Sequence, residues 1–281
     1  MPVNDELGVR MKTYYEQIPK TKLMRRTPVA IRIDGKAFHT FTKGFHKPFD
    51  EILIKAMQAT MKYLCENIQG CVLGYHQSDE ITLILVDYKN LNSDAWFDYE
   101  VQKMCSIAAS MATMAFNREF EKLVDNFDLD HLIELGGYIE YDCNENEKLS
   151  NIYYKAISKG AMFDARVFNI PKEEVTNLLY WRQLDAVRNS IQMVGQANFS
   201  HKELHGKSCN NIKDMLIAEK CIDWDNFPTY QKRGSCCIKA RYEDTTEDEG
   251  AFVTRTYWII DTEIPIFKGE DRQYIDKLIF I

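Results

Sequence analysis

The sequence has no long apolar run and no paired-cysteine motif. None of its hydrophobic stretches approaches the roughly 20 residues that a membrane-spanning helix needs. The first ten residues lack the apolar segment of a secretory signal peptide. Its eight cysteines are scattered, and no two of them have the C-x-x-C spacing of a zinc or thioredoxin-like site. We therefore expect a cytoplasmic protein without membrane contact, whose thiols are reduced and mostly buried.

Several functional motifs are also missing. No Walker-type G-x-x-x-x-G-K-[ST] loop is present, so bound phosphates would be held by metal and scattered basic groups. No nucleophile motif predicts a serine or cysteine triad. The net charge of -7 does not predict nucleic-acid binding. A basic segment near the start either binds phosphates or forms a solvated surface, and its cations are Arg10, Lys12, Lys20, Lys22, Arg25 and Arg26.

The 281 residues, of which 45% are hydrophobic, suffice for one large domain or two small ones. Hydrophobic periodicity predicts alternating strands and helices in the first 170 residues. They are a strand at Val29 to Ile33, a helix at about Phe49 to Ile68, a hairpin of Cys71 to Tyr75 and Glu80 to Val86, a helix after an N-cap at Ser93-Asp94, and a strand at Ala161 to Ile170. This order predicts an α+β fold, the ferredoxin-like βαββαβ arrangement, with an antiparallel sheet and both helices on one face.

The rest of the chain begins with Pro171, which is expected to open a third helix. Trp181, Leu184, Val187, Ile191 and Val194 form an apolar stripe on it that we expect in the core. Residues 201–205 (HKELH) favour a helix start with a capping box over a zinc site. The acidic run at 243–249 predicts an exposed loop between two strands. We expect residues 1–170 to form the catalytic domain with an N-terminal extension. Residues 171–281 would be C-terminal helices and strands packed on it, across a boundary that no change of composition marks.

Carboxylates end two strands that should be neighbours in this sheet. Asp34 ends the first strand, and Asp79 and Glu80 lie at the hairpin tip, so the three acids can converge at one edge. Magnesium prefers such oxygen ligands together with phosphates and water. Gly35 allows close approach of the backbone, and its carbonyl is a possible further ligand. Each segment is also typical of an ordinary turn, and spacing alone favours the metal site only modestly.

Six ordered motifs resemble those of the tRNA(His)-guanylyltransferase family. They are residues 32–39 (RIDGKAFH), 47–50 (KPFD), 77–80 (QSDE), 163–166 (FDAR), 181–183 (WRQ) followed by Asp185, and 232–234 (KRG). The resemblance implies a polymerase-type palm, and an enzyme that adds nucleotides to the 5′ end of tRNA in the 3′-to-5′ direction. It also implies a homo-tetramer, a dimer of dimers.

The resemblance assigns roles to individual residues. Asp34, the Gly35 carbonyl and Asp79 would bind two magnesium ions, and Glu80 would be an additional catalytic acid beside them. The nucleoside triphosphate substrates, GTP and ATP, would contact Asp34, Gly35, Lys36, Ala37, Phe38, His39, Ser78 and Asp79. Lys47 would neutralise phosphate charge. Arg32 points to the same side of its strand as Asp34, so it either reaches this site or pairs with an acid.

One segment departs from the family pattern. Members dedicated to histidine tRNA carry His-Ile-Asn-Asn-Leu-Tyr-Asn where this chain has residues 187–193 (VRNSIQM), and only Asn189 is retained. The chain therefore resembles the guanylyltransferase-like branch, which repairs 5′-truncated tRNAs by template-directed addition. Two alternatives stay open. One is a nucleotide cyclase of the diguanylate type, although such enzymes carry Gly-Gly where this chain has Gln77-Ser78. The other is a non-catalytic tRNA-binding protein.

Overall fold

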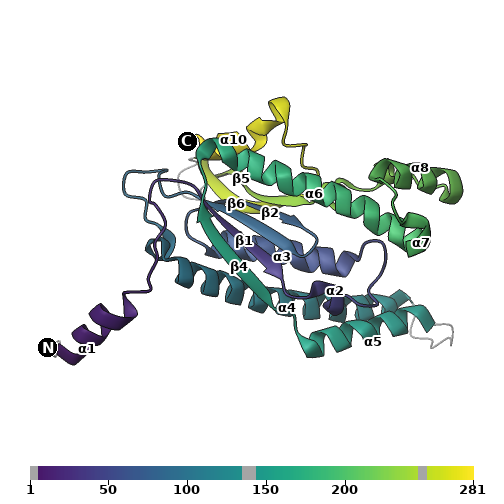
Figure 1. Ribbon diagram of the computed structural model, residues 1–281, viewed down its shortest axis with the longest axis horizontal. Helices are drawn as coiled ribbons and strands as arrows, with labels where there is room; N and C mark the ends of the chain where they lie inside the picture. The colour runs from purple at the N-terminus through teal and green to yellow at the C-terminus, as the bar shows by residue number, and fades with distance from the viewer. Residues whose placement is uncertain (1–5, 135–143, 246–251) are drawn as a thin grey trace.

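The centre of the molecule is a six-stranded antiparallel sheet (Figure 1). The computed structural model describes residues 6–134, 144–245 and 252–281. The strands are β1 (Val29–Gly35), β2 (Cys71–Gln77), β3 (Glu80–Leu85), β4 (Phe163–Asn169), β5 (Ser235–Thr245) and β6 (Phe252–Asp261), in the spatial order β4-β1-β3-β2-β5-β6. The first four have the order of the predicted ferredoxin-like fold, which is confirmed.

Two long helices cover one face of the sheet, as predicted. They are α3 (Glu51–Asn67) and α4 (Val101–Glu134). Alternation along β1 sends Val29, Ile31 and Ile33 into the core that these helices share with the sheet. Asp50 caps α3 by accepting a hydrogen bond from the N–H of Leu53 at 2.9 Å.

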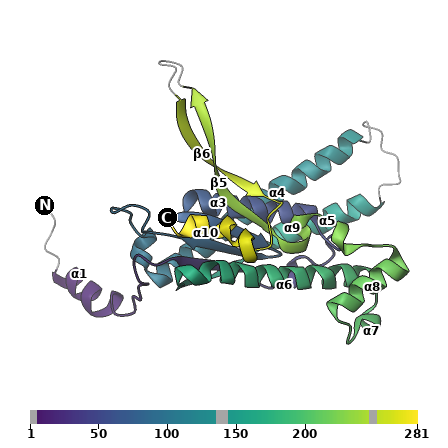
Figure 2. The ribbon, with the colours of Figure 1, turned by 90° about the horizontal axis from the view of Figure 1, so that it is seen from above.

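Elements from the C-terminal part of the chain cover the opposite face. Ala30 and Ile84 pack there against α6 (Lys172–Asn198) and α10 (Gln273–Ile279). The far half of α6 continues beyond the sheet to α7 (His201–Leu204) and α8 (Cys209–Lys220) (Figures 1 and 2). Because β5 pairs with β2, the sheet itself crosses the expected boundary at residue 170.

The remaining elements are short or peripheral. They are α1 (Glu6–Met11), η1 (Lys12–Glu16), α2 (Phe38–Phe41), η2 (Trp96–Tyr99), α5 (Asn144–Lys159), η3 (Trp224–Asn226), α9 (Thr229–Arg233) and η4 (Gly269–Arg272). Within the described ranges, none of the helices is both long and apolar enough to cross a membrane.

The predicted start of the second long helix is wrong. Ser93 does not cap a helix, because its hydroxyl accepts a hydrogen bond from the N–H of Asn90 in a separate turn. Residues 97–99 have positive φ, and α4 begins only at Val101. The Tyr99 carbonyl accepts a hydrogen bond from the Leu23 N–H at 3.0 Å. Contact with the N-terminal segment therefore holds this stretch out of the helix.

The stripe predicted on α6 is correct only in its C-terminal half. Ile191 and Val194 are buried, but Trp181 is 52% exposed and Leu184 is 49% exposed. Their neighbours Arg182 and Gln183 are buried instead, and Gln183 donates a hydrogen bond to the Pro265 carbonyl and accepts one from the Phe267 N–H. Polar partners in the rest of the molecule thus set which face of α6 turns inward.

Three other expectations have clear outcomes. The capping box at the start of α7 is confirmed, since Ser200 and Glu203 bond reciprocally. In the basic segment, Lys22 and Arg25 both pair with Asp98, so these two cations are partly neutralised. The acidic run belongs to β5 as far as Thr245, and its remainder lies outside the described residues.

Candidate active site

Carboxylates gather where β1 meets the hairpin tip. Asp34 lies directly opposite Glu80 of β3 and Asp164 of β4. Opposed residues of antiparallel strands project to the same face, so all three acids are on the α6 side of the sheet. The N–H of Gly35 donates a hydrogen bond to the Asp79 carbonyl at 3.1 Å. The two segments predicted to form the metal site are therefore adjacent.

Asp34 and Asp79 together suit a divalent cation. Burial, followed by the negative charge of Asp34, raises the pKa of Asp79. A cation between the two carboxylates would relieve that repulsion. In the part of the chain that the structure describes, no three His, Cys, Asp or Glu side chains form a closed metal cluster. An ion here would complete its shell with backbone oxygen, water or substrate phosphate, which is how magnesium is usually held.

Gly35 is required by packing rather than by an unusual backbone angle. A Cβ atom at this position would lie 2.2 Å from Cδ2 of Phe38. Phe38 is buried and contacts the rings of Phe41, Phe116 and Phe163, so it has little room to move. Only glycine lets the end of β1 approach α2 so closely.

The turn after Gly35 presents main-chain N–H groups. The Lys36 N–H donates to the Met162 carbonyl at 2.8 Å, and Ala37 adopts the left-handed conformation before α2. Phe38 and His39 open that helix, so their N–H groups have no partner within it and can donate hydrogen bonds to phosphate oxygens. His39 is exposed, and it lies near enough to Asp79 to oppose the rise of that pKa.

Glu80 is bound by arginines. Its carboxylate accepts a hydrogen bond from Nε of Arg182 at 2.7 Å, and Nε of Arg32 lies 3.7 Å away. Burial raises the pKa of Glu80, and the charge of Arg182 partly offsets this. The buried Nε of Arg32 makes no hydrogen bond within the described structure. Arg32 therefore lies close to Glu80 and also next to the proposed metal site. The hydrogen bond between Glu80 and Arg182 links the hairpin to α6.

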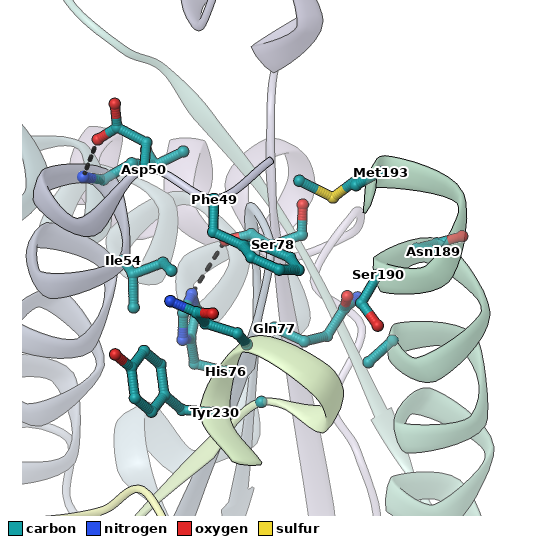
Figure 3. A pocket seen from close by; sticks show the side chains of 14 residues that line it. Phe49, Asp50, Ile54, His76, Gln77, Ser78, Asn189, Ser190, Met193 and Tyr230 are labelled. Atoms are coloured by element: carbon teal, nitrogen blue, oxygen red, sulfur yellow. Dashed lines mark hydrogen bonds between the residues drawn. The ribbon is translucent and has the colours of Figure 1, made fainter. Parts of the chain in front are cut away.

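A buried histidine, which the sequence did not single out as functional, supports the tip. His76 is buried, and this lowers its pKa to about 4, so the ring is neutral at physiological pH. Its Nε2–H donates to the Ser78 carbonyl at 2.9 Å, and Ser235 donates to its Nδ1 at 3.5 Å. Figure 3 shows the bond to Ser78, a residue with a positive φ of 52°. No local sequence signal gives this role, because Ser235 is distant along the chain.

A small pocket of about 70 Å³ lies beside the tip (Figure 3). Its walls come from the start of α3, the hairpin, α6 and α9. The lining includes Phe49, Asp50, His76, Gln77, Ser78, Asn189, Ser190, Met193, Tyr230, Gln231 and Gly234. Four of the ordered sequence motifs, or the residues next to them, therefore meet here although they are far apart in the chain. Lys47 is exposed on the loop that joins α2 to α3.

Comparison with known proteins gives consistent matches. A family model for tRNAHis guanylyltransferase (Thg1) matches residues 8–171. A bacterial tRNA(His) guanylyltransferase (Thg1)-like protein, solved in complex with ATP, is 39% identical with a TM-score of 0.76, over 97% of this chain and 98% of that one. One solved with GTP is 36% identical with a TM-score of 0.74, over 99% and 100%. The tRNA(His) guanylyltransferase of Saccharomyces cerevisiae is 26% identical over 74% of this chain and 80% of its own length.

Proposed function

Because this chain belongs to the tRNA(His) guanylyltransferase family, whose members are nucleotidyltransferases, we propose that it adds nucleotides to the 5′ end of tRNA in the 3′-to-5′ direction. The single observation that carries the proposal is the hydrogen bond between Gly35 and Asp79. It brings the carboxylates of Asp34 and Asp79, which repel each other, close together. The ATP and GTP bound to the two similar bacterial proteins support nucleoside triphosphates as substrates.

In the proposed reaction, the 3′ oxygen of an incoming nucleotide bonds to the α-phosphorus of an activated 5′ end. The bond from that phosphorus to the leaving group breaks, and the hydroxyl proton is released. The leaving group is pyrophosphate where the end is a triphosphate, and AMP where ATP has activated a monophosphate. Asp34, Asp79 and the Gly35 carbonyl would hold two magnesium ions, which supply activation of the attacking oxygen and charge stabilisation of the leaving group.

The chain's own cations and amides support this chemistry. Arg32 has a guanidinium nitrogen without a hydrogen bond, and it lies on the Asp34 side of β1. It would bind a phosphate oxygen in a charge-assisted contact. The N–H groups that open α2 would bind further phosphate oxygens, and Lys47 would reduce the remaining phosphate charge. Glu80 would position the hairpin through Arg182 rather than bind metal.

We further propose that 5′-truncated tRNAs are the substrates. The segment that departs from the histidine-tRNA pattern, residues 187–193, contributes two altered residues, Ser190 and Met193, and the retained Asn189 to the pocket beside the tip. A changed pocket wall at this place supports a substrate other than full-length histidine tRNA.

The test is to incubate the protein with magnesium, nucleoside triphosphates and a 5′-truncated tRNA. We expect extension by the templated nucleotide, and loss of extension in Asp34→Ala, in Asp79→Ala and after chelation of magnesium. Asp214→Ala is the matched control, because Asp214 is an exposed acid on α8.

Four results would contradict the proposal in different ways. Unchanged extension by a folded Asp79→Ala variant would remove the carboxylate site from the reaction. Addition of guanosine to full-length histidine tRNA alone would reverse the branch. A cyclic product formed from nucleotides without RNA would favour the cyclase, and tRNA binding indifferent to magnesium and Asp79 would favour a non-catalytic protein.

A further inference from the structure

Trp181 is a large aromatic side chain held at the surface of α6. It is 52% exposed, whereas burial is the usual fate of a tryptophan on a helix that packs on a sheet. Two guanidinium groups contact its ring, since Cζ of Arg182 lies 4.5 Å from the ring centroid and Cζ of Arg32 lies 5.9 Å from it. The indole is therefore fixed in an exposed position by its neighbours.

The same two arginines place Trp181 next to the carboxylates. Arg32 is two residues before Asp34 on the same face of β1. Arg182 binds Glu80, which is directly opposite Asp34 in the sheet. The indole thus contacts two arginines that are themselves next to the proposed reaction centre.

The face of the sheet beside Trp181 is open to solvent. Asp164 and Arg166 of β4 are on this face, and their side chains are 57% and 56% exposed. Figure 1 shows α6 running along one side of the face, with β1 and β4 lying beside it. A substrate can therefore reach the ring and the carboxylates from the same side.

Further residues extend the surface along α6. Leu184 and Arg188 follow Trp181 at i+3 and i+7, so they lie on its side of the helix, and both are exposed. The strip spans about 10 Å, which is longer than one nucleotide. An exposed aromatic ring on a surface that also carries the exposed Arg166 and Arg188 is the combination that binds RNA strands, since bases stack and phosphates pair with the cations.

We propose that Trp181 is the stacking platform for the nucleobase at the 5′ end of the RNA that is extended. The inference rests on the proposed function and assigns this surface to the RNA rather than to the incoming nucleotide. The length of the strip and the exposed Arg188 at its far end carry that choice. The main-chain N–H groups of α2 would serve the triphosphate instead.

The test uses an RNA whose 5′ nucleotide is 2-aminopurine, bound in magnesium without nucleoside triphosphates. We expect stacking to quench its fluorescence in the wild-type protein and in Trp181→Phe, and the quenching to be lost in Trp181→Ala. In the addition assay, Trp181→Ala should raise the KM for RNA about tenfold and leave the KM for the nucleotide unchanged. Ile217→Ala, at an exposed apolar position on α8, is the control.

The possible outcomes separate this inference from the proposed function. If the wild-type protein adds nucleotides and Trp181→Ala does so with the same KM for RNA, only the platform is overturned. If Trp181→Ala raises only the KM for the nucleotide, the ring binds the incoming nucleotide rather than the RNA, and the platform is also overturned. Failure of the wild-type protein to bind or extend RNA would overturn both. Thermal unfolding of each variant shows whether an effect comes from lost structure.

Discussion

At the scale of single residues, the folded structure disfavours the ionised form of the Asp79 carboxyl. Its carboxyl is desolvated and close to Asp34, and both effects raise its pKa. A carboxyl whose pKa is higher in the folded state than in the unfolded state destabilises the fold once the pH rises above the unfolded value, about 3.9. The folded protein therefore gains stability when Asp79 is protonated, neutralised or bound to a cation.

We predict that Asp79→Asn raises the Tm at pH 7 in the presence of a chelator and abolishes nucleotide addition. Magnesium should then raise the Tm of the wild-type protein and not that of the variant, because binding to the folded state alone stabilises it. Calorimetry with and without magnesium measures both effects, and Asp214→Asn is the control. A variant less stable than the wild type in chelator would show that the carboxylate stabilises the fold through another contact.

The pH dependence of addition follows from the same shift. Protons and magnesium compete for Asp79, so addition should fall as the pH drops through its raised pKa. A higher magnesium concentration should move this acidic limb to lower pH. Rates measured across pH at two magnesium concentrations test the prediction, and an acidic limb that magnesium does not move would contradict it.

At the scale of elements, the sequence predicted what local periodicity encodes. β1 and the hairpin show strand patterns, and Pro171 marks the start of α6 correctly. The start of α4 was not predictable, because the N-terminal segment bonds to residues 99 and 101 and no local signal reports that contact. The inward face of α6 was missed for a similar reason. A hydrophobicity pattern places Arg182 on the surface because it is charged. Its burial depends on Glu80, which is 102 positions away in the sequence.

The Arg182–Glu80 pair should be a strong link between α6 and the hairpin. We predict that Arg182→Met lowers the free energy of unfolding by roughly 3–5 kcal/mol, because it leaves the buried Glu80 carboxylate without its main partner. The double variant Arg182→Met/Glu80→Gln should recover much of that loss, since no uncompensated charge remains. Urea unfolding of the single and double variants measures the coupling.

Arg188→Met provides the control for this experiment. Both Arg182 and Arg188 pair with Asp185. The side chain of Arg188 is 61% exposed, so its loss should change stability by no more than about 0.5 kcal/mol. Equal effects of the two single substitutions would mean that the buried contact to Glu80 contributes nothing beyond a surface ion pair.

At the scale of the whole molecule, the N-terminal segment stands out from an otherwise well-covered core. In both Figures 1 and 2, α1 lies away from the sheet and its helices. Five apolar side chains of this segment are between 59% and 75% exposed: Leu7, Val9, Tyr14, Tyr15 and Ile18. Several exposed large apolar side chains within one short segment indicate an interface, and the family resemblance implies a homo-tetramer. We therefore expect this segment to lie between subunits.

We predict that the full chain forms a tetramer, and that removal of residues 1–19 gives a smaller assembly while the subunit stays folded. The contacts of the following residues remain in the truncated chain, among them the bridge between Lys22 and Glu100 and the hydrogen bond from Leu23 to Tyr99. Sedimentation equilibrium gives the mass, and circular dichroism reports the fold. Leu7→Asp combined with Val9→Asp in the full chain should have the same effect, because two charges would be buried at the interface. An unchanged mass in both proteins would place the subunit contacts elsewhere, and the apolar segment would then need a different partner.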